Sequence, residues 1–437
     1  MANGYGRRID VPGSVDLVGL HAQSPHKYPF LLQSTSGVGG LGRYDVLFAA
    51  PDELISSDDG DFLPRLDSAF RKARGESDPT MPFSGGWFLY LGYELAGDVE
   101  PSLSLRPDPE LPAAFAVRCR AAIVRERGTG DTTLVCEDGV GDDLVSDVLE
   151  DIAGITWEAR TPGVLHVMED NAEDFLHAVR TAKRYIEEGS IYQANLSRAW
   201  RVKLDSATRP ADIYTSLTQA NPAPFSGIVR FRDTSILSSS PERLLRLLDG
   251  VAETRPIAGT RPRSDDLGLD TALSAELIAH PKERAEHIML IDLERNDLGR
   301  FCQPGSVEVD EFMVIESYAH VHHIVSNVRG IPNSDTTPSE AIAAVFPGGT
   351  ITGCPKVRCM QIISELETDP RGAYTGAFGY LNLDGSMDLN ILIRTMVMTG
   401  DTLSFRAGSG IVADSDPEHE LLETRAKAKG MLKALGE

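Results

Sequence analysis

Residues 171–197 read NAEDFLHAVRTAKRYIEEGSIYQANLS, and the spacing of their apolar side chains changes once within this stretch. Four apolar residues recur at the spacing of one helix face: Phe175, Val179, Ala182 and Ile186. A helix is expected there, and Gly189 is placed to end it. Residues 191–197 then predict a strand in which three polar side chains share one face: Gln193, Asn195 and Ser197. Helices and strands are therefore mixed in this part of the chain.

The residues on either side of this stretch extend the pattern. Up to about residue 160, short apolar runs such as 44–48 and 87–91 are cut by Gly and Pro, which predicts short strands joined by loops. Beyond residue 197, the chain predicts a strand-rich segment at 225–256, helices at about 272–297, 337–346 and 355–366, strands around 376–383, 389–398 and 403–412, and a last helix at about 417–435. Two regions are expected, residues 1–160 and 161–437, without a long linker between them.

The composition limits the classes of partner. Of 437 residues, 41% are hydrophobic, and 42 Lys plus Arg face 65 Asp plus Glu, which gives a net charge of −23. This charge argues against nucleic acid or an anionic membrane as the main partner. No stretch approaches the roughly 18 apolar residues of a membrane span, and five scattered cysteines predict neither disulfides nor zinc, so a cytoplasmic protein is expected. An anionic substrate would require a cation or converging arginines to invert the field locally.

Two similar carboxylate pairs are the strongest chemical signal in the residues themselves. Glu283 and Glu286 form one pair and Glu420 and Glu423 the other, each early in a predicted helix that opens with proline. Glutamates three residues apart share a helix face, and two such faces could offer oxygen ligands to a hard divalent ion such as Mg²⁺. The alternative is a solvated helix face, which is the usual role of such a pair.

Glycine-rich segments and a histidine group are weaker signals. Residues 347–353 precede a predicted helix and residues 407–410 end a predicted strand, so their backbone N–H groups could hold a carboxylate or could simply form tight turns. Neither segment fits a P-loop or a dinucleotide-binding motif. His320, His322 and His323 have an awkward spacing for a metal, which favours a single imidazole acting as acid, base or orienting group. No nucleophile elbow surrounds Cys354, so no glutaminase is expected within this chain.

Across about its last 270 residues the chain resembles the chorismate-utilising enzyme family. The strings that carry the resemblance are SIYQANLSR, SSSPERLLRL, RPIAGTRPR, KERAEHIMLIDLERNDLGR, YAHVHHIVSNVRG, FPGGTITGCPKVRCMQII, RGAYTGAFGY, MDLNILIRT and AGSGIVADSDPEHELLETRAKA. The resemblance implies a large α+β sandwich of two β-sheets with helices. The N-terminal region, similar to that of anthranilate synthase component I, would be woven into the same body as the chorismate-binding catalytic domain.

The resemblance also implies roles for matching residues. The Mg²⁺ ligands would be the two pairs already selected by spacing, Glu283, Glu286, Glu420 and Glu423. Substrate binding, chiefly of the carboxylates of chorismate, would fall to Tyr374, Arg394, Gly408, Gly410, Thr350, Gly259 and Thr260. Glu242 and His323 would lie beside the hydroxyl at C4 and assist its departure, because hydroxide leaves poorly without protonation.

The residue at one position distinguishes the family members that add water from those that add ammonia. Members that add water resemble one another in having a lysine where this chain has Gln193, and glutamine cannot act as a base. The branches with glutamine there use ammonia. The resemblance therefore implies ammonia as the nucleophile, supplied by a separate glutamine amidotransferase subunit.

The two ammonia-using branches differ in product. The segments YQANL, NPAPFS, HHIVS, DLNI and GRYDVLFAAP resemble aminodeoxychorismate synthase and imply conversion of chorismate to 4-amino-4-deoxychorismate, for folate biosynthesis. Ala258 points the other way, because the matching position in many such enzymes is a lysine that attacks C2. The alternatives are anthranilate synthase component I, which makes anthranilate and pyruvate, and a chorismate-binding regulator or inactive paralogue. Residues 31–34, LLQS, resemble a segment near the tryptophan site of anthranilate synthases but carry Gln33 in place of glutamate.

Overall fold

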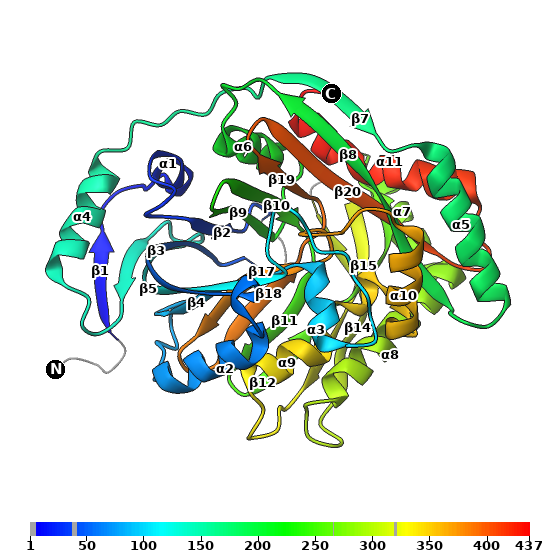
Figure 1. Ribbon diagram of the computed structural model, residues 1–437, viewed down its shortest axis with the longest axis horizontal. Coiled ribbons are helices and arrows are strands. Elements are labelled where there is room, and N and C mark those ends of the chain that lie inside the picture. The colour runs from blue at the N-terminus through cyan, green and yellow to red at the C-terminus, as the bar shows by residue number, and fades with distance from the viewer. Residues whose placement is uncertain (1–5, 37–41, 265, 319–320) are drawn as a thin grey trace.

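A computed structural model describes residues 6–36, 42–264, 266–318 and 321–437 (Figure 1). Its strands are all paired antiparallel. One half follows the order β7 (Val164–Glu169), β8 (Gln193–Leu204), β20 (Thr402–Ile411), β19 (Thr395–Thr399), β10 (Thr234–Ser240), β9 (Phe225–Phe231), β2 (Phe30–Gln33), β3 (Tyr44–Ser56), β5 (Ala114–Glu126), β6 (Thr132–Cys136) and β1 (Arg7–Val11), with β16 (Gly353–Cys354) on the start of β8.

The other half of the strand network starts from the same long strand β5. It runs through β4 (Gly86–Leu91), β17 (Ala377–Asn382), β18 (Met387–Ile391), β11 (Arg243–Leu248), β12 (Val251–Thr254) and β15 (Val321–Gly330), and β15 also pairs with β13 (Ile257–Pro262) and β14 (Glu308–Ser317). The expected α+β class is confirmed. The strands, expected as two sheets, are linked through β5 into one continuous hydrogen-bonded network.

The N-terminal strands are woven into the same body as the rest of the chain. β2 pairs with β9, and β4 pairs with β17 across nearly 300 residues of sequence. Aromatic side chains fix this arrangement, because Phe30 of β2 stacks on Phe88 of β4 at 4.1 Å and Phe115 of β5 stacks on Phe231 of β9 at 4.0 Å between ring centroids. Residue 160 lies in the connection between α4 and β7.

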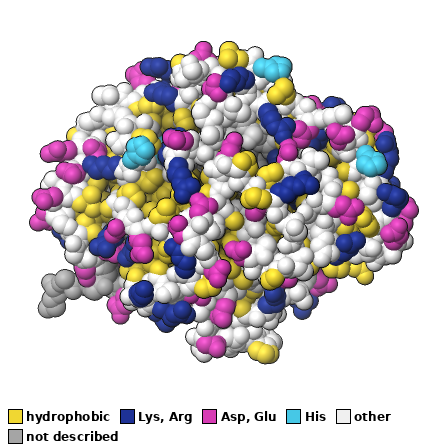
Figure 2. Space-filling view, in the orientation of Figure 1, with side chains coloured by type: hydrophobic (Ala, Val, Ile, Leu, Met, Phe, Trp, Pro, Cys, Tyr) yellow, Lys and Arg dark blue, Asp and Glu magenta, His cyan; other side chains and the backbone are white. Residues whose placement is uncertain are grey.

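Helices cover the strand network on several sides (Figure 1). They are α1 (Leu17–Gln23), α2 (Phe62–Ala73), α3 (Ala96–Val99), α4 (Asp142–Ala153), α5 (Ala172–Glu187), α6 (Pro210–Ala220), α7 (Leu267–Ala279), α8 (Pro281–Gly299), α9 (Pro338–Val345), α10 (Lys356–Leu366) and α11 (Pro417–Ala434). α11 packs on β20, α5 and α6, whereas α7 and α8 pack on β13 and β15. No helix in the described ranges has the length and apolar character needed to cross a membrane. Side chains of both charge signs are interspersed over the face in Figure 2.

The decisive stretch folds as predicted. α5 begins after Asn171, whose side chain accepts from the backbone N–H of Glu173, and β8 starts at Gln193. Two other expectations were wrong. The single helix at 272–297 is two helices, because Pro281 cannot donate a backbone hydrogen bond and holds His280 in an extended conformation. The single strand at 389–398 is interrupted between β18 and β19, where Arg394 has a left-handed φ of 52°.

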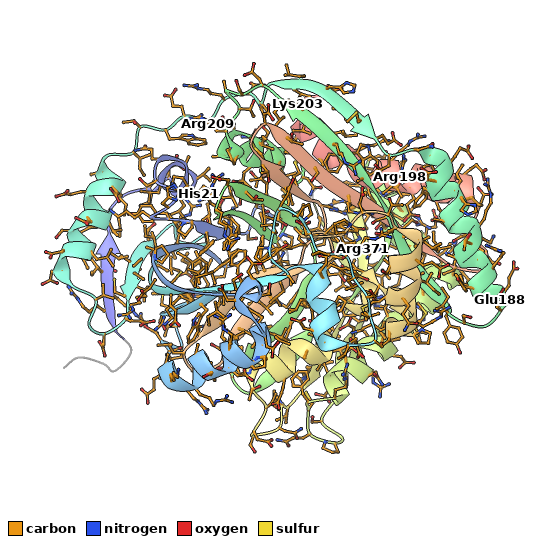
Figure 3. The ribbon with its side chains drawn as sticks, in the orientation of Figure 1. His21, Glu188, Arg198, Lys203, Arg209 and Arg371 are labelled. Atoms are coloured by element: carbon orange, nitrogen blue, oxygen red, sulfur yellow. The ribbon has the colours of Figure 1, made fainter. Side chains whose placement is uncertain are left out.

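A buried ionic network ties α10 to the strand network. Glu367 accepts hydrogen bonds from Arg371 at 2.7 and 3.0 Å and from Arg406 at 3.0 Å. It also accepts from the backbone and hydroxyl of Ser197 at 2.8 and 3.0 Å. These partners hold the pKa of Glu367 below its usual value despite burial. Arg371 lies in the interior beside the strands (Figure 3).

We expect Glu367→Ala to lower the free energy of unfolding by about 3–5 kcal/mol, because it leaves two buried guanidinium groups without their counter-charge. Chemical denaturation measures this. Glu365→Ala is the matched control on the same helix, since Glu365 is an exposed partner of Tyr185 and should change stability by less than about 0.5 kcal/mol. Equal effects of the two variants would show that the network contributes no special stability.

Candidate active site

The two glutamate pairs lie near the start of α8, which packs on β13 and β15, and near the start of α11, which packs on β20. The pKa of Glu286 is raised by burial, and then by the negative charges of Glu283 and, more weakly, Glu423. Glu286 and Glu420, one from each pair, lie at neighbouring residues of β20, since a Cβ on Gly410 would lie 3.7 Å from a carboxylate oxygen of Glu286 and the hydroxyl of Ser409 donates to Glu420. The structure thus brings both predicted pairs to one place.

Each of the four carboxylates has a partner from within the chain. The pairs are Glu283 with Arg261 at 3.4 Å, Glu286 with the amide nitrogen of Gln193 at 3.3 Å, Glu420 with the hydroxyl of Ser409, and Glu423 with Lys427 at 2.8 Å. Among the described residues, no three Asp, Glu, His or Cys side chains are grouped as a metal site. The oxygen donors nevertheless suit a hard divalent ion, which would replace these partners on binding.

Gln193, the first residue of β8, lies beside Glu286 of the first pair. The neighbouring strand β20 leaves room for its side chain. A Cβ on Gly410 of β20 would lie 2.6 Å from the amide nitrogen of Gln193, and a Cβ on Gly408 would lie 2.6 Å from the hydroxyl oxygen of Tyr374. Neither position tolerates a side chain without displacing these groups. At 407–410 the backbone of β20 therefore closely approaches polar side chains.

Glu242 is a buried carboxyl between β10 and β11. Burial raises its pKa to about 7, and neighbouring Thr350, the backbone at Ile257 and the cation Arg394 offset part of this effect. A carboxyl with such a pKa is partly protonated at neutral pH and can therefore donate a proton. The hydroxyl of Thr350 is buried beside this carboxyl.

His323 is also buried, and its imidazole is held in one orientation. Its Nδ1 lies 3.1 Å from the carbonyl oxygen of Gly259 and 3.1 Å from the hydroxyl of Thr260. Burial, and then the charge of Arg394, lowers the pKa of His323 to about 4, so the ring is neutral at neutral pH. A neutral imidazole that donates from Nδ1 presents Nε2 as an acceptor. His323 is thus suited to accept or orient a proton, and Glu242 is the better acid.

His322 of the same group is not part of this site. His322 pairs with Asp270 at 2.9 Å and with the hydroxyl of Ser317 at 2.8 Å. His320 lies outside the described residues. Of His322 and His323, the structure places His323 beside Gly259 and Thr260.

Ala258 lies beside Gly259 in β13 and is buried. Its backbone pairs with Ile324 of β15, and the register of β13 shifts just after it. A lysine at this position would have to extend from the same strand that carries Gly259 and Thr260.

Sequence reasoning missed Lys427, which lies one helical turn after Glu423. Its ammonium donates to the carbonyl oxygen of Gly408 at 3.0 Å and pairs with Glu423. The charges of Lys427 and Arg394 both act on Glu242 and on His323. Arg394 is partly buried, and the loss of solvent around its guanidinium lowers its pKa. Two cations thus oppose the overall negative charge at this place, as an anionic substrate requires.

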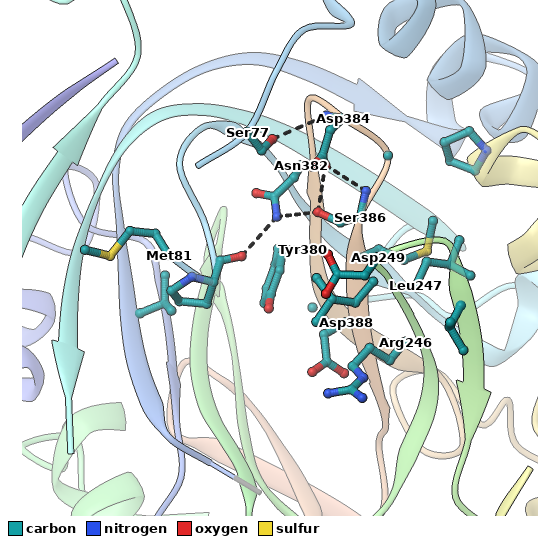
Figure 4. Close-up of a pocket in the computed structure, with 18 of the residues that line it drawn as sticks. Ser77, Met81, Arg246, Leu247, Asp249, Tyr380, Asn382, Asp384, Ser386 and Asp388 are labelled. Atoms are coloured by element: carbon teal, nitrogen blue, oxygen red, sulfur yellow. Dashed lines mark hydrogen bonds between the residues drawn. The ribbon is translucent and has the colours of Figure 1, made fainter. Parts of the chain in front are cut away.

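A large cavity lies elsewhere, between the N-terminal strands and the turn after β17 (Figure 4). It has a volume of about 1210 Å³, and its lining includes Leu32 and Gln33 of the LLQS segment. In Figure 4 the amide of Asn382 donates to the carbonyl oxygen of Pro82 at 3.0 Å and to the hydroxyl of Ser386 at 2.9 Å. This cavity is separate from the residues that converge on Glu242 and Glu286.

Comparison with known proteins identifies the family. The family described as chorismate binding enzyme matches residues 28–433. The chain belongs to this family. As a chorismate-binding enzyme, it is 38% identical to aminodeoxychorismate synthase component 1 of Bacillus subtilis, covering 95% of this chain and 93% of that protein. It is 35% identical to anthranilate synthase component 1 of Acetivibrio thermocellus, covering 93% and 90%.

A third relative and two solved structures agree with this assignment. An anthranilate synthase component I-like protein of Synechocystis is 42% identical over 81% of this chain and 73% of that protein. The crystal structure of anthranilate synthase component I from Streptococcus pneumoniae superposes with a TM-score of 0.80 at 31% identity, covering 90% of this chain and 93% of that one. The isochorismate synthase MenF of Escherichia coli shares the fold, with a TM-score of 0.77 at 21% identity over 98% and 94%.

Proposed function

We propose that this chorismate-binding enzyme aminates chorismate to 4-amino-4-deoxychorismate, with ammonia delivered by a separate glutaminase subunit. The observation that carries the proposal is the amide of Gln193 at the carboxylates of α8, where a lysine would activate water. Glutamine can hydrogen-bond a nitrogen nucleophile but cannot deprotonate water. Ammonia is therefore the nucleophile that this side chain suits.

The product is inferred from several segments rather than from one residue. Five segments resemble the aminodeoxychorismate synthase branch, and the similarity of the chain to its Bacillus relative extends over 95% of its length. Relatives named anthranilate synthase component 1 have nearly the same identity. Anthranilate synthesis is the second candidate, because Ala258 stands where many enzymes of the first branch have lysine. An inactive binding protein is disfavoured, since the acid, the imidazole and both glutamate pairs are present.

The site residues have separate proposed roles in substrate binding, metal binding and proton transfer. Arg394, Tyr374, Thr350 and the backbone at Gly408 and Gly410 hold the carboxylates of chorismate. Bound Mg²⁺, held by Glu283, Glu286, Glu420 and Glu423, would neutralise a carboxylate and favour addition of the nucleophile at C2. Glu242 donates a proton to the C4 hydroxyl as it leaves, and His323 orients that hydroxyl. A second ammonia then adds at C4, and the amine at C2 leaves.

Pyruvate release separates the two candidate products. The purified chain is incubated with chorismate, Mg²⁺ and ammonium, and pyruvate is measured against chorismate consumed. The proposal predicts consumption without stoichiometric pyruvate, because 4-amino-4-deoxychorismate keeps the enolpyruvyl group. One pyruvate per chorismate would support anthranilate synthesis instead.

We expect Ala258→Lys to change the ratio of products and to lower ammonium-dependent turnover at least tenfold, because a buried amine beside Gly259 competes with ammonia for C2. Chromatography of the products measures the ratio, and mass spectrometry of the intact protein detects any covalent adduct. Ala252→Ser, in neighbouring β12, is a control for substitution of a buried alanine. If the products and the rate of Ala258→Lys equal those of wild type, residue 258 does not determine the product.

A further inference from the structure

Asn195 lies two residues after Gln193 on the same face of β8 and has no role assigned so far. Its backbone is opposite Gly410 of β20, and its amide oxygen would lie 2.5 Å from a Cβ on Gly408. The hydroxyl oxygen of Tyr374 would lie 2.6 Å from the same point. The side chain of Asn195 is therefore directed toward the expected substrate-binding groups.

Two buried acceptors on this face have no donor. Within the described part of the chain, neither the amide oxygen of Gln193 nor that of Asn195 accepts a hydrogen bond, although both atoms are buried. Gln193 uses its nitrogen for Glu286 and so keeps its oxygen for another group. Buried acceptors without a donor destabilise a fold and are uncommon, so a missing donor at this place indicates a ligand.

The neighbouring charges indicate what kind of donor fits. A carboxylate oxygen of Glu286 would lie 3.7 Å from a Cβ on Gly410, and the amide nitrogen of Gln193 would lie 2.6 Å from the same point, so a negative charge lies beside the Gln193 amide. Ammonia offers three N–H donors and keeps its single lone pair for attack on C2, whereas water offers two donors and its oxygen must also find a donor. The arrangement therefore suits a nitrogen donor better than water.

We propose that Asn195 is a specificity-determining residue that, with Gln193, binds the incoming ammonia through its side-chain oxygen. The inference rests on the proposed function, since it requires that ammonia be the nucleophile. Asn195 contacts the nitrogen, and the carboxylates of chorismate are held by other residues. Loss of the amide should therefore affect the use of ammonium and spare the binding of chorismate.

The test compares Asn195→Leu, Asn195→Asp and wild type, with ammonium chloride as the nitrogen source and Mg²⁺ present. Leucine has a similar size but no acceptor, and it should raise KM for ammonium about tenfold, as expected for one lost hydrogen bond, with KM for chorismate within twofold. Aspartate keeps the oxygen and should keep KM for ammonium within about threefold of wild type. Asn333→Leu, in the loop before α9, is the control for the general effect of replacing an asparagine by leucine.

The outcomes are distinguishable. An unchanged KM for ammonium in Asn195→Leu, with wild-type melting temperature, overturns the inference and leaves the proposed function intact. A rise in KM for chorismate alone also overturns it, because Asn195 would then contact the substrate carboxylate. If the wild-type chain forms no aminated product, the proposed function fails and this inference fails with it.

Discussion

Glu242→Gln should lower kcat by about 10²–10⁴-fold, the usual contribution of a positioned general acid. The amide keeps the shape of the carboxyl and cannot transfer a proton to the departing C4 hydroxyl. KM for chorismate should change little, because Glu242 carries no part of the carboxylate binding. Steady-state kinetics of the two proteins measures both constants, and Glu365→Gln, on the surface of α10, is the control.

The pKa of Glu242 adds a pH dependence to the same prediction. Its acid form is required, so the wild-type rate should fall as pH rises through about 7. Stability changes in the same direction, because a carboxyl whose pKa is raised on folding binds more protons in the folded state and so loses stability between its ordinary pKa and about pH 7. Glu242→Gln should therefore be more stable than wild type at pH 8, by up to about 3 kcal/mol. A variant with full activity and the wild-type pH profile would contradict the assignment.

Glu286→Gln should lower kcat/KM by about 10²–10³-fold, since it removes one ligand of the proposed Mg²⁺ and the charge that holds the ion. The wild-type chain should lose activity in EDTA and recover it on addition of Mg²⁺. In the variant, a much higher Mg²⁺ concentration should be needed for half-maximal rate. Titration of Mg²⁺ at fixed chorismate measures this shift.

Glu418→Gln provides the comparison for the metal. Glu418 is exposed on α11 beside the second glutamate pair, where it pairs with Arg180. Its replacement should leave the Mg²⁺ requirement unaltered. If the wild-type enzyme is equally active in EDTA, or if both variants have the same Mg²⁺ dependence, the metal assignment is wrong.

The sequence was most informative where chemistry follows local spacing. Glutamates three residues apart on two proline-initiated helices predicted a shared carboxylate site, and the structure places Glu286 and Glu420 at neighbouring residues of β20. The helix before β8 was predictable for the same reason, because its N-cap Asn171 and the apolar residues of its buried face lie in one short stretch of sequence.

Other features depend on contacts between distant segments. Arg394 stands in a run of apolar residues that alternates like one strand, and its left-handed backbone is held by Ser239, whose N–H donates to the carbonyl of Arg394 at 3.2 Å. The pKa of Glu242 depends on burial by strands that are more than a hundred residues apart. Lys427 was missed because a lysine four residues after a glutamate usually forms a surface pair. Its contact with Gly408 is visible only in the folded chain.

The central claim is that ammonia replaces the C4 hydroxyl of chorismate and the enolpyruvyl group stays. The most direct measurement is mass spectrometry of the product formed from chorismate, Mg²⁺ and an ammonium salt, before and after addition of an aminodeoxychorismate lyase. The account predicts an aminodeoxychorismate that the lyase converts to p-aminobenzoate. Anthranilate together with released pyruvate would contradict it, and would show that Ala258 outweighs the other segments in setting the product.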